Sequence, residues 1–467
     1  MPDTRKVKMF LKDEEISKPE FHDFFFEFEN KYKVFDLKTD RGVPFWDILR
    51  FDIFLELCYG NGIVICEKKT LSNKLKRRLE ISGRLLISFI KLFFLQYQDF
   101  FLSESRTKDV KGYQYDSYFD QVSSLIGKNI YYELNSPTLK YSNYKRRVFD
   151  IRIIFRKLRV FKSSISEQEQ INLNKIIDGV DCFFNQKIDY DKYKSLYEDF
   201  LFDYNFYHFL LKFKNIKRLF VVQRGVQKAL FLAAKDLNIA TFEFQHGDIV
   251  KSTLLYNYFS LDNIDLNNIS FSKYLLTFSK FWTDNKNIPS QCVEIGSETL
   301  SKTVEKSTFN KNIVIISSPS HFDVLKSIAI EISIKYPDYT ILFKLHPIEY
   351  PLYTTYKNIF KNYSNISLIA DQLDVLELMK ISNNFVVVYS TVIYELIHNE
   401  KNIYIYKKVD YNKFENSANI PNVFLFENIK DFSLRNEIES EIKYNKEFDI
   451  FFKKFNKEIF LNIINNQ

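Results

Sequence analysis

Beyond residue 215, this chain alternates short apolar runs with amphipathic segments, and no other feature constrains its fold as strongly. Short apolar runs are typical of strands that are buried on both faces, and the segments between them have helical spacing. Parallel strands joined by helices predict an α/β fold. The predicted strands lie at 216–223, 239–244, 274–278 and 293–295, and then at 313–316, 340–345, 366–370, 385–388 and 403–406.

The two series of strands predict two domains. A chain of 467 residues is too long for one ordinary core, and the series meet near residues 296–307. We therefore predict two Rossmann-like lobes with a cleft between them. The first lobe covers 1–298 and includes a helix at 44–59, and the second covers 299–442. The C-terminal segment 443–467, an amphipathic helix over 443–465, packs back on the first lobe.

Charge and cysteine content exclude several classes of protein. The net charge of +7 arises from 66 basic and 59 acidic residues, a balance that does not indicate nucleic-acid binding. The four cysteines lack the paired spacing of a metal site. Unpaired thiols are typical of a reduced compartment. The charged N-terminus does not resemble a signal peptide, and no apolar run is long enough to span a membrane. We expect a cytoplasmic protein.

Residues 71–102 begin with a cluster of cations and then become strongly apolar. Two interpretations stay open: a core helix with a solvated basic start, or a helix that docks on an anionic membrane surface. The second would place peripheral contact with the inner membrane at residues 74–91. The cations of the basic start are Lys74, Lys76, Arg77, Arg78 and Arg84.

Polar clusters follow four of the predicted strands. Ligands of open parallel sheets bind at the carboxyl ends of the strands, where helix N-termini offer free amides to anions. Three clusters lie in the second lobe, so we expect that lobe to bind the phosphates of a nucleotide and the first lobe to supply the acceptor side. The clusters are Gln245, His246, Gly247 and Asp248; Ser317 and Ser318; His346 and Pro347; and Ser390 and Thr391.

Two histidines are the candidates for the chemistry. His346 precedes Pro347, which holds the backbone extended, and its imidazole suits a group that donates to a phosphate or protonates a leaving group. His246 precedes Gly247, where the backbone can approach a ligand closely, and it suits a general base. For each histidine the alternative is a structural role.

A third donor-side segment begins at Ser390. The hydroxyls of Ser390 and Thr391 can cap the following helix or bind a phosphate at its N-terminus. Glu395 lies one turn further on the same face and can accept a hydrogen bond from a ribose hydroxyl. Plain helix capping is the alternative.

Three motifs together resemble a known family. Phe-Gln-His-Gly (244–247), Phe-Lys-Leu-His-Pro (343–347) and Tyr-Ser-Thr-Val-Ile-Tyr-Glu (389–395) resemble the GT-B glycosyltransferases of bacterial capsule and lipopolysaccharide assembly. They are also similar to CDP-glycerol glycerophosphotransferases and to bacterial sialyl- and polysialyltransferases. The resemblance covers about residues 215–410, and the run 42–50 more weakly resembles an N-terminal signature of surface-carbohydrate enzymes.

The resemblance implies a GT-B-like fold and roles for particular residues. His346 would contact the donor phosphate, Ser390 and Thr391 would bind the same region, and His246 would be the candidate base. The sialyltransferase-like families commonly place an acidic base in the first lobe. The carboxylates that could fill that role here are Glu104, Asp116 and Asp120.

We therefore expect an inverting glycosyltransferase without a cofactor. It should not need a metal, because no Asp-x-Asp motif follows a predicted strand. Its donor would be a nucleotide-activated sugar, foremost a CMP-activated sialic-acid-like or Kdo-like sugar. Its acceptor would be a glycan or a lipid-linked glycan. Three alternatives stay open: a CDP-polyol phosphotransferase, a UDP-sugar 2-epimerase, and a non-catalytic, membrane-docked scaffold of a polysaccharide complex.

Overall fold

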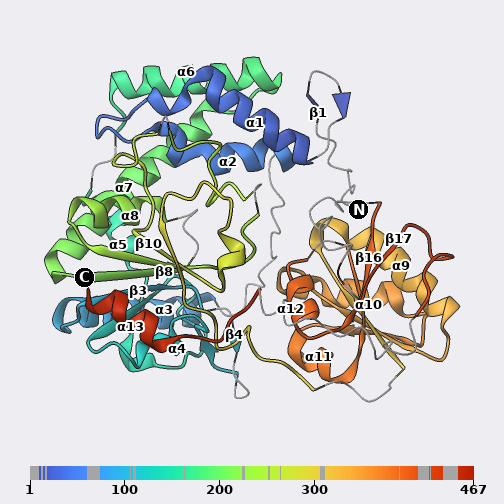
Figure 1. Cartoon of the computed structure of the whole chain (residues 1–467). Helices are drawn as coiled ribbons and strands as arrows, with labels where there is room; N and C mark the ends of the chain where they lie inside the picture. Colours follow the sequence, from blue (N-terminus) through green and yellow to red (C-terminus); the bar gives the residue numbers. More distant parts are fainter. Residues whose placement is uncertain are drawn as a thin grey trace. The chain divides into compact units, whose positions relative to one another are not determined.

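The structure is a computed structural model that describes residues 10–11, 14–15, 18–59, 74–105, 107–108, 112–161, 164–222, 227–250, 253–262, 264–305, 311–388, 390–408, 420, 422–434 and 451–466. The chain divides into two compact units (Figure 1). The first is Met1–Gly296 together with Asn456–Gln467, and the second is Ser297–Phe455. The second unit thus extends past the predicted limit at 442.

The first unit is built on a sheet of seven strands, all of whose neighbours are parallel. Numbered along the chain from β3 and taken from the β7 edge, the strands have the order 3-2-1-4-5-6-7. Its first six positions have the Rossmann order. Across the sheet the strands are β7 (Arg147–Phe149), β6 (Asn129–Glu133), β3 (Asp99–Ser103), β8 (Arg218–Val222), β9 (Ala240–Phe244), β10 (Tyr274–Thr277) and β11 (Gln291–Glu294).

Helices cover both faces of this sheet. On one face, Phe100 of β3 belongs to the large apolar core that includes residues of α3, α7 and α8. On the other face, Phe101 packs on Phe119 beside α4, and Phe220 packs on Phe460 of α13. The helices are α1 (Lys18–Tyr32), α2 (Phe45–Tyr59), α3 (Lys74–Phe94), α4 (Asp120–Ser123), α5 (Arg152–Lys157), α6 (Glu167–Phe184), α7 (Tyr190–Lys214), α8 (Lys228–Asp236) and α13 (Lys457–Asn465).

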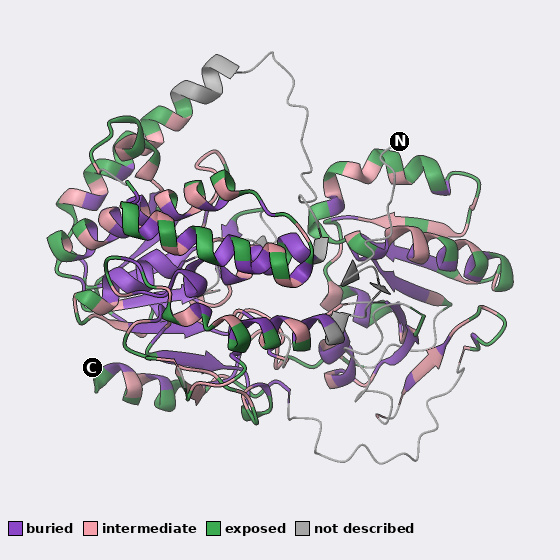
Figure 2. Cartoon of the chain, turned by 90° about the horizontal axis from the view of Figure 1, so that it is seen from above, coloured by how far each residue is buried: buried purple, intermediate pink, exposed green. Residues whose placement is uncertain are grey.

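The burial pattern of the strands explains this layering. All five residues of β3 and all five of β6 are buried, and successive side chains of a strand point to opposite faces. A strand that is apolar on both faces needs cover on both. In Figure 2 the strands are accordingly mostly buried, while the outer faces of the helices are exposed.

The second unit has a six-stranded parallel sheet. Numbered from β12, its strand order is 3-2-1-4-5-6, which is the full Rossmann order. Across the sheet the strands are β14 (Ile366–Ile369), β13 (Thr340–Lys344), β12 (Asn312–Ile316), β15 (Asn384–Val387), β16 (Asn402–Tyr406) and β17 (Val423–Phe426). Its helices are α9 (Phe322–Lys335), α10 (Tyr353–Phe360), α11 (Val375–Ile381) and α12 (Val392–His398).

The α/β class and the two Rossmann-like sheets that the sequence predicts are confirmed. Each of the nine predicted strands appears within two residues of its expected limits, and the helix expected at 44–59 is α2. The strands β3, β6 and β7 of the first sheet were not predicted. Two short antiparallel pairs complete the described strands: β1 (Phe10–Leu11) with β2 (Glu14–Glu15), and β4 (Thr107–Lys108) with β5 (Gln114–Tyr115).

The helix predicted within 443–465 is wrong at its start, because α13 begins only at Lys457. Residues 443–450 lie outside the described residues, and 451–456 are not helical. Phe451 packs on Tyr394 and Phe452 on His398, so two adjacent side chains are buried in the second unit. The helix α13 itself belongs to the first unit.

The described part of the basic and apolar region, from residue 74 to residue 102, is a helix followed by a strand. Its helical part is α3, and β3 follows from Asp99. Within the part of the chain that the structure describes, no helix is long and apolar enough to cross a membrane.

Candidate functional site

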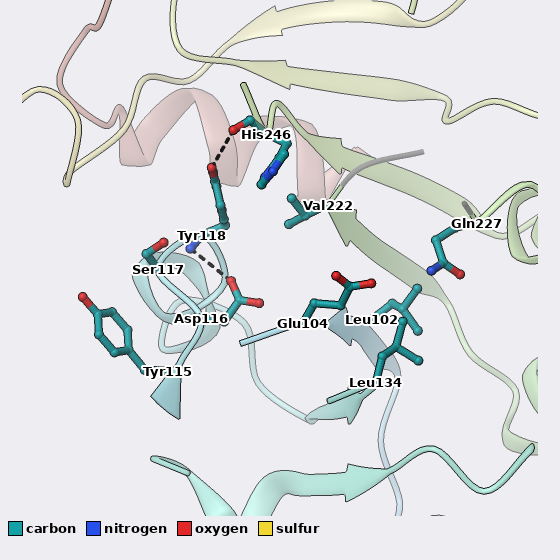
Figure 3. A pocket seen from close by; sticks show the side chains of 10 residues that line it. All are labelled: Leu102, Glu104, Tyr115, Asp116, Ser117, Tyr118, Leu134, Val222, Gln227 and His246. Atoms are coloured by element: carbon teal, nitrogen blue, oxygen red, sulfur yellow. Dashed lines mark hydrogen bonds between the residues drawn. The ribbon is translucent and has the colours of Figure 1, made fainter. Parts of the chain in front are cut away.

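A cavity of about 180 Å³ opens in the first unit at the carboxyl ends of four strands (Figure 3). Leu102 and Glu104 come from the end of β3, Leu134 from the end of β6, Val222 from β8 and His246 from the end of β9. The strands β3 and β8 are the pair at which the strand order reverses, and ligands of open α/β sheets bind at such a point. The other lining residues are Tyr115, Asp116, Ser117, Tyr118 and Gln227.

Glu104 and His246 bring titratable groups into this cavity. In Figure 3 the carboxylate of Glu104 and the ring of His246 extend toward the middle of the cavity from opposite sides. A carboxylate and an imidazole are the side chains that most often serve as general bases. The sequence named both residues as candidates for that role, and the fold places them in one cavity.

Tyr118 holds the segment that carries His246. Its hydroxyl donates a hydrogen bond of 2.9 Å to the backbone oxygen of His246 (Figure 3). Its ring lies parallel to that of Phe278, with 6.5 Å between the ring centroids. A residue 128 positions earlier in the chain thus fixes the backbone of His246.

Asp116 lines the cavity, but its carboxylate is engaged in holding the loop before α4. One oxygen accepts from the backbone N–H groups of Tyr118 and Phe119, both at 3.1 Å. The other accepts from the hydroxyl of Ser103 at 2.9 Å. Burial and, less strongly, the charge of Glu133 raise the pKa of Asp116 to about 6, although the hydrogen bonds from Phe119 and Ser103 oppose this rise.

A fully buried ion pair lies directly behind this loop. The guanidinium of Arg147 pairs with the carboxylate of Glu133, and both side chains are completely buried. Ser103 and Ser105 donate to Glu133, at 3.3 and 2.9 Å. The single proton of the Ser103 hydroxyl lies between Glu133 and the closer Asp116, 2.9 Å away, so the ion pair and the loop with Asp116 form one polar network.

These contacts rank the three carboxylates that the sequence offered as an alternative base. Asp120 does not line the cavity, and its carboxylate accepts from the hydroxyl of Tyr131 at 2.6 Å. Asp116 has both oxygens committed to structural hydrogen bonds. Glu104 is the carboxylate that extends into the cavity, so it is the acidic base candidate that the geometry favours.

The neighbours of His246 that were predicted for the acceptor side differ in their surroundings. Gln245 is completely buried, and its amide donates to the oxygen of Gly247 at 2.7 Å and accepts from the N–H of Phe278 at 3.0 Å. Gln245 therefore shapes the loop. Gly247 does not adopt the left-handed conformation, and a Cβ added to it would meet nothing within 4 Å. Asp248 is half-buried next to it.

The run 42–50 secures the segment that follows His246. In α2, Asp47 accepts from the hydroxyl of Tyr258 at 2.7 Å and from the N–H of Ser270 at 2.8 Å. Arg50 donates to the oxygens of Leu254 and Asn257, at 2.9 and 2.8 Å. Both side chains are buried. The run 42–50, which more weakly resembles an N-terminal signature of surface-carbohydrate enzymes, thus anchors the segment after His246 by long-range hydrogen bonds.

In the second unit, Glu349 joins the ends of two neighbouring strands. Its buried carboxylate accepts from the hydroxyl of Ser317, after β12, at 3.1 Å and from the N–H of His346, after β13, at 2.9 Å. Burial raises the pKa of Glu349. Two of the predicted donor-binding segments are therefore held together by a residue that the sequence analysis did not name.

The hydrogen bonds of His346 indicate its tautomer. Its Nδ1 accepts from the N–H of Ile348 at 3.3 Å, where Pro347 opens a short 3-10 turn. Partial loss of water around the ring, and then the charge of Lys344, lower the pKa of His346, which favours the neutral imidazole at neutral pH. A neutral ring that accepts at Nδ1 carries its proton on Nε2. The exposed ring thus presents an N–H donor, as contact with a phosphate oxygen requires.

The remaining predicted donor residues lie at the point where the strand order of the second sheet reverses, between β12 and β15. Ser318 is buried after β12, and Ser390 and Thr391 follow β15. The hydroxyl of Ser390 accepts from the N–H of Val392 at 3.3 Å, whereas the side chain of Thr391, the N-cap residue of α12, makes no capping hydrogen bond. Glu395 is half-buried in α12, and loss of water followed by the charge of Asp374 raises its pKa to about 7.

Sequence reasoning missed four residues that support the two sites. Glu349 had a readable signal, because an acidic residue three positions after His346 matches a capping box. Tyr118, Glu133 and Arg147 had none, because their partners are distant in sequence. Within the described ranges, no group of three or more His, Cys, Asp or Glu side chains could hold a metal ion.

Comparisons with known proteins give only distant structural likeness. No family model matches the chain, and no curated protein matches it. It is similar to the UDP-GlcNAc 2-epimerases of Methanocaldococcus jannaschii (13% identity, 79% of this chain, 99% of that chain, TM-score 0.41) and Neisseria meningitidis (13%, 79%, 100%, 0.40). It is also similar to MurG of Acinetobacter baumannii (10%, 70%, 85%, 0.37). At these identities and TM-scores the likeness assigns no activity to the chain.

Proposed function

We propose that the protein is a nucleotide-sugar-dependent glycosyltransferase of bacterial capsule or lipopolysaccharide synthesis. It works in the cytoplasm without a metal and inverts the configuration at the anomeric carbon of the transferred sugar. Its donor is a CMP-activated sugar of the sialic-acid or Kdo type, and its acceptor is a glycan or a lipid-linked glycan. The observation that carries the proposal is the polar side chains that lie where the strand order reverses in each of the two sheets.

In the second unit, the segments after β12, β13 and β15 suit the phosphate of the donor. These segments carry the hydroxyls of Ser318 and Ser390, and His346 adds an N–H donor at Nε2. Donors that are preorganised toward a departing phosphate lower the barrier of group transfer, and such electrostatic stabilisation is usually the largest catalytic contribution. We assign His346 to the donor phosphate.

In the first unit, the cavity with Glu104 and His246 suits the acceptor. One of the two removes the proton of the acceptor hydroxyl while that oxygen attacks the anomeric carbon, and the nucleotide leaves with the electron pair of the broken bond. Glu104 is the favoured base because its carboxylate extends into the cavity. His246 then contacts the acceptor.

Nucleotide binding tests the proposal. Thermal shift and calorimetry with the full chain should show binding of CMP and a CMP-sugar over UDP and GDP. Loss of one hydrogen bond to a charged phosphate costs about 1.5–3 kcal/mol, so His346→Ala should weaken CMP binding by roughly 10- to 100-fold. His208→Ala, which replaces a half-buried histidine of α7, is the matched control and should bind normally.

Other outcomes would replace the proposal. Binding of CDP together with transfer of a polyol phosphate would make the chain a CDP-polyol phosphotransferase. Release of an epimerised UDP-sugar without any acceptor would make it a 2-epimerase. Failure to bind any nucleotide would favour the non-catalytic scaffold.

A further inference from the structure

Three segments of the first unit expose large apolar side chains. They are the end of α3 (83–95), α5 with the residues after it (153–161), and the end of α7 with the residues after it (209–217). We call these three segments the basic apolar patch. The most exposed of its apolar side chains are Phe94 at 81%, Leu158 at 69% and Phe213 at 55%. The others are Leu86, Ile87, Phe89, Ile90, Leu95, Ile153, Val160 and Phe209.

Ring contacts join the three segments into one surface. Phe89 of α3 lies 6.4 Å from Phe155 of α5, and Phe155 lies 6.4 Å from Phe209 of α7. Phe93 of α3 lies 5.2 Å from Phe213 of α7. These distances join ring centroids. The exposed side chains are therefore neighbours, although their segments are up to about 130 residues apart in the chain.

The outward face of α3 has the wrong character for a helix that meets only water. Leu86, Phe89, Ile90 and Phe94 occupy positions i, i+3, i+4 and i+8 of the helix and are exposed, which makes one apolar stripe. The opposite face of α3 already contacts the protein, since its Leu92 is completely buried. Contiguous apolar surface of this kind marks a site of contact with a partner or a membrane.

The charges of the patch are all of one sign. The segments contain two, three and three basic residues, respectively, and no acidic residue. Arg156 is paired with Asp199 and Asp203 of α7. Lys157, Arg159 and Lys212 are exposed beside the apolar side chains. Apolar side chains surrounded by cations are typical of elements that lie in the interface of an anionic bilayer.

We propose that the basic apolar patch docks the protein on an anionic lipid bilayer. The apolar side chains enter the boundary between headgroups and acyl chains, and the cations contact the lipid phosphates. A second copy of the chain is the weaker candidate, because a two-fold interface would oppose the patch to itself and bring its cations together.

This surface differs from the one that the sequence predicted at residues 74–91. It includes the exposed stripe of α3 but adds α5 and the end of α7, which sequence reasoning did not connect with α3. The side chains of 74–79 lie outside the described residues. The proposal does not depend on the proposed transferase activity, because bilayer binding needs no donor or acceptor.

Vesicle flotation with the full chain tests the proposal. The protein should float with vesicles of 70% phosphatidylcholine and 30% phosphatidylglycerol, and far less with pure phosphatidylcholine. The triple variant Phe94→Ser, Leu158→Ser and Phe213→Ser, and separately the variant Lys157→Gln, Arg159→Gln and Lys212→Gln, should each lower the partition coefficient about tenfold or more. Binding of the unchanged protein to anionic vesicles should weaken as the salt concentration rises, and binding of the charge variant should not.

Matched controls separate the patch from general apolarity and charge. Ile334→Ser in α9 removes an apolar side chain of 68% exposure, and Lys311→Gln, Lys361→Gln and Lys380→Gln remove three exposed cations of the second unit. Both controls should float like the unchanged protein. Absence of flotation with anionic vesicles, or equal loss in the controls, would overturn the proposal. A dimer that the patch variants dissociate, without effect on flotation, would overturn it in favour of self-association.

Discussion

The two sheets have the same strand order at their centres, yet they support their polar side chains by different means. In the first unit, the cavity rests on a completely buried ion pair, Glu133 with Arg147, that is linked through Ser103 to Asp116. In the second unit, a single buried carboxylate, Glu349, ties Ser317 to the backbone of His346. The first arrangement buries charge of both signs, and the second completes a cap at the start of a turn.

This difference teaches what each site can do. Hydrogen bonds to fixed backbone groups and to Ser103 hold the loop of Asp116 in place, so the cavity keeps its shape while Glu104 and His246 extend into it. The cap at His346 leaves its ring exposed and orients one N–H donor outward. A preformed cavity suits the selection of an acceptor by its shape. An exposed N–H donor suits the binding of an anionic phosphate.

The largest effect should come from the base in the first unit. Glu104→Gln keeps the size of the side chain but removes its basicity, so kcat for transfer should fall by about 10²- to 10⁴-fold while the affinity for CMP stays unchanged. Glu167→Gln, at an exposed position of α6, is the control. If His246→Ala lowers kcat by that factor and Glu104→Gln does not, the base assignment moves to His246.

The buried ion pair should give the largest effect on stability. Arg147→Met leaves the carboxylate of Glu133 buried without its partner, which costs about 3–5 kcal/mol in the free energy of unfolding. Hydrogen exchange of β3 and β6 measures this in the first unit alone. Lys407→Met breaks the exposed pair with Glu427 in the second unit and should cost less than about 1 kcal/mol. Equal effects of the two variants would refute the contrast between the units.

The raised pKa of Asp116 predicts a smaller, pH-dependent effect. A carboxyl whose pKa is about 6 in the folded protein and 3.8 in the unfolded chain stabilises the fold below pH 3.8, and this contribution is lost as the pH rises through 6. Relative to Asp116→Asn, the unchanged protein should therefore lose stability between pH 4 and pH 6, by on the order of 2 kcal/mol. Hydrogen exchange of β3 in both proteins at several pH values measures it, and a difference that is constant with pH would contradict the shift.

The elements around the second site could largely be predicted from the sequence, whereas β3 and β6, whose ends carry Glu104 and Leu134 into the first site, were not. Strands β12, β13 and β15 and the polar residues after them have a local signature, because apolar runs and the hydroxyls that follow them are adjacent in the chain. The prediction of a helix over 443–465 was wrong because it also relied on a local pattern. That pattern did not reveal that Phe451 and Phe452 are buried in the second unit. A local pattern predicts an element but not its partner.

The sequence by itself determined the α/β class, the two series of strands and the position of His246, His346, Ser317 and Ser390 after strands. These properties follow from the order of apolar and polar residues over a few positions, which decides how a segment folds.

Only the tertiary structure decided which of these side chains share a site. The hydroxyl of Tyr118 reaches His246 across 128 residues, Glu133 pairs with Arg147, and Phe93 of α3 meets Phe213 of α7. Such contacts form because buried polar groups must find partners and apolar faces must be covered, and the order of strands in the sheet, not their order in the chain, determines which partners lie within reach.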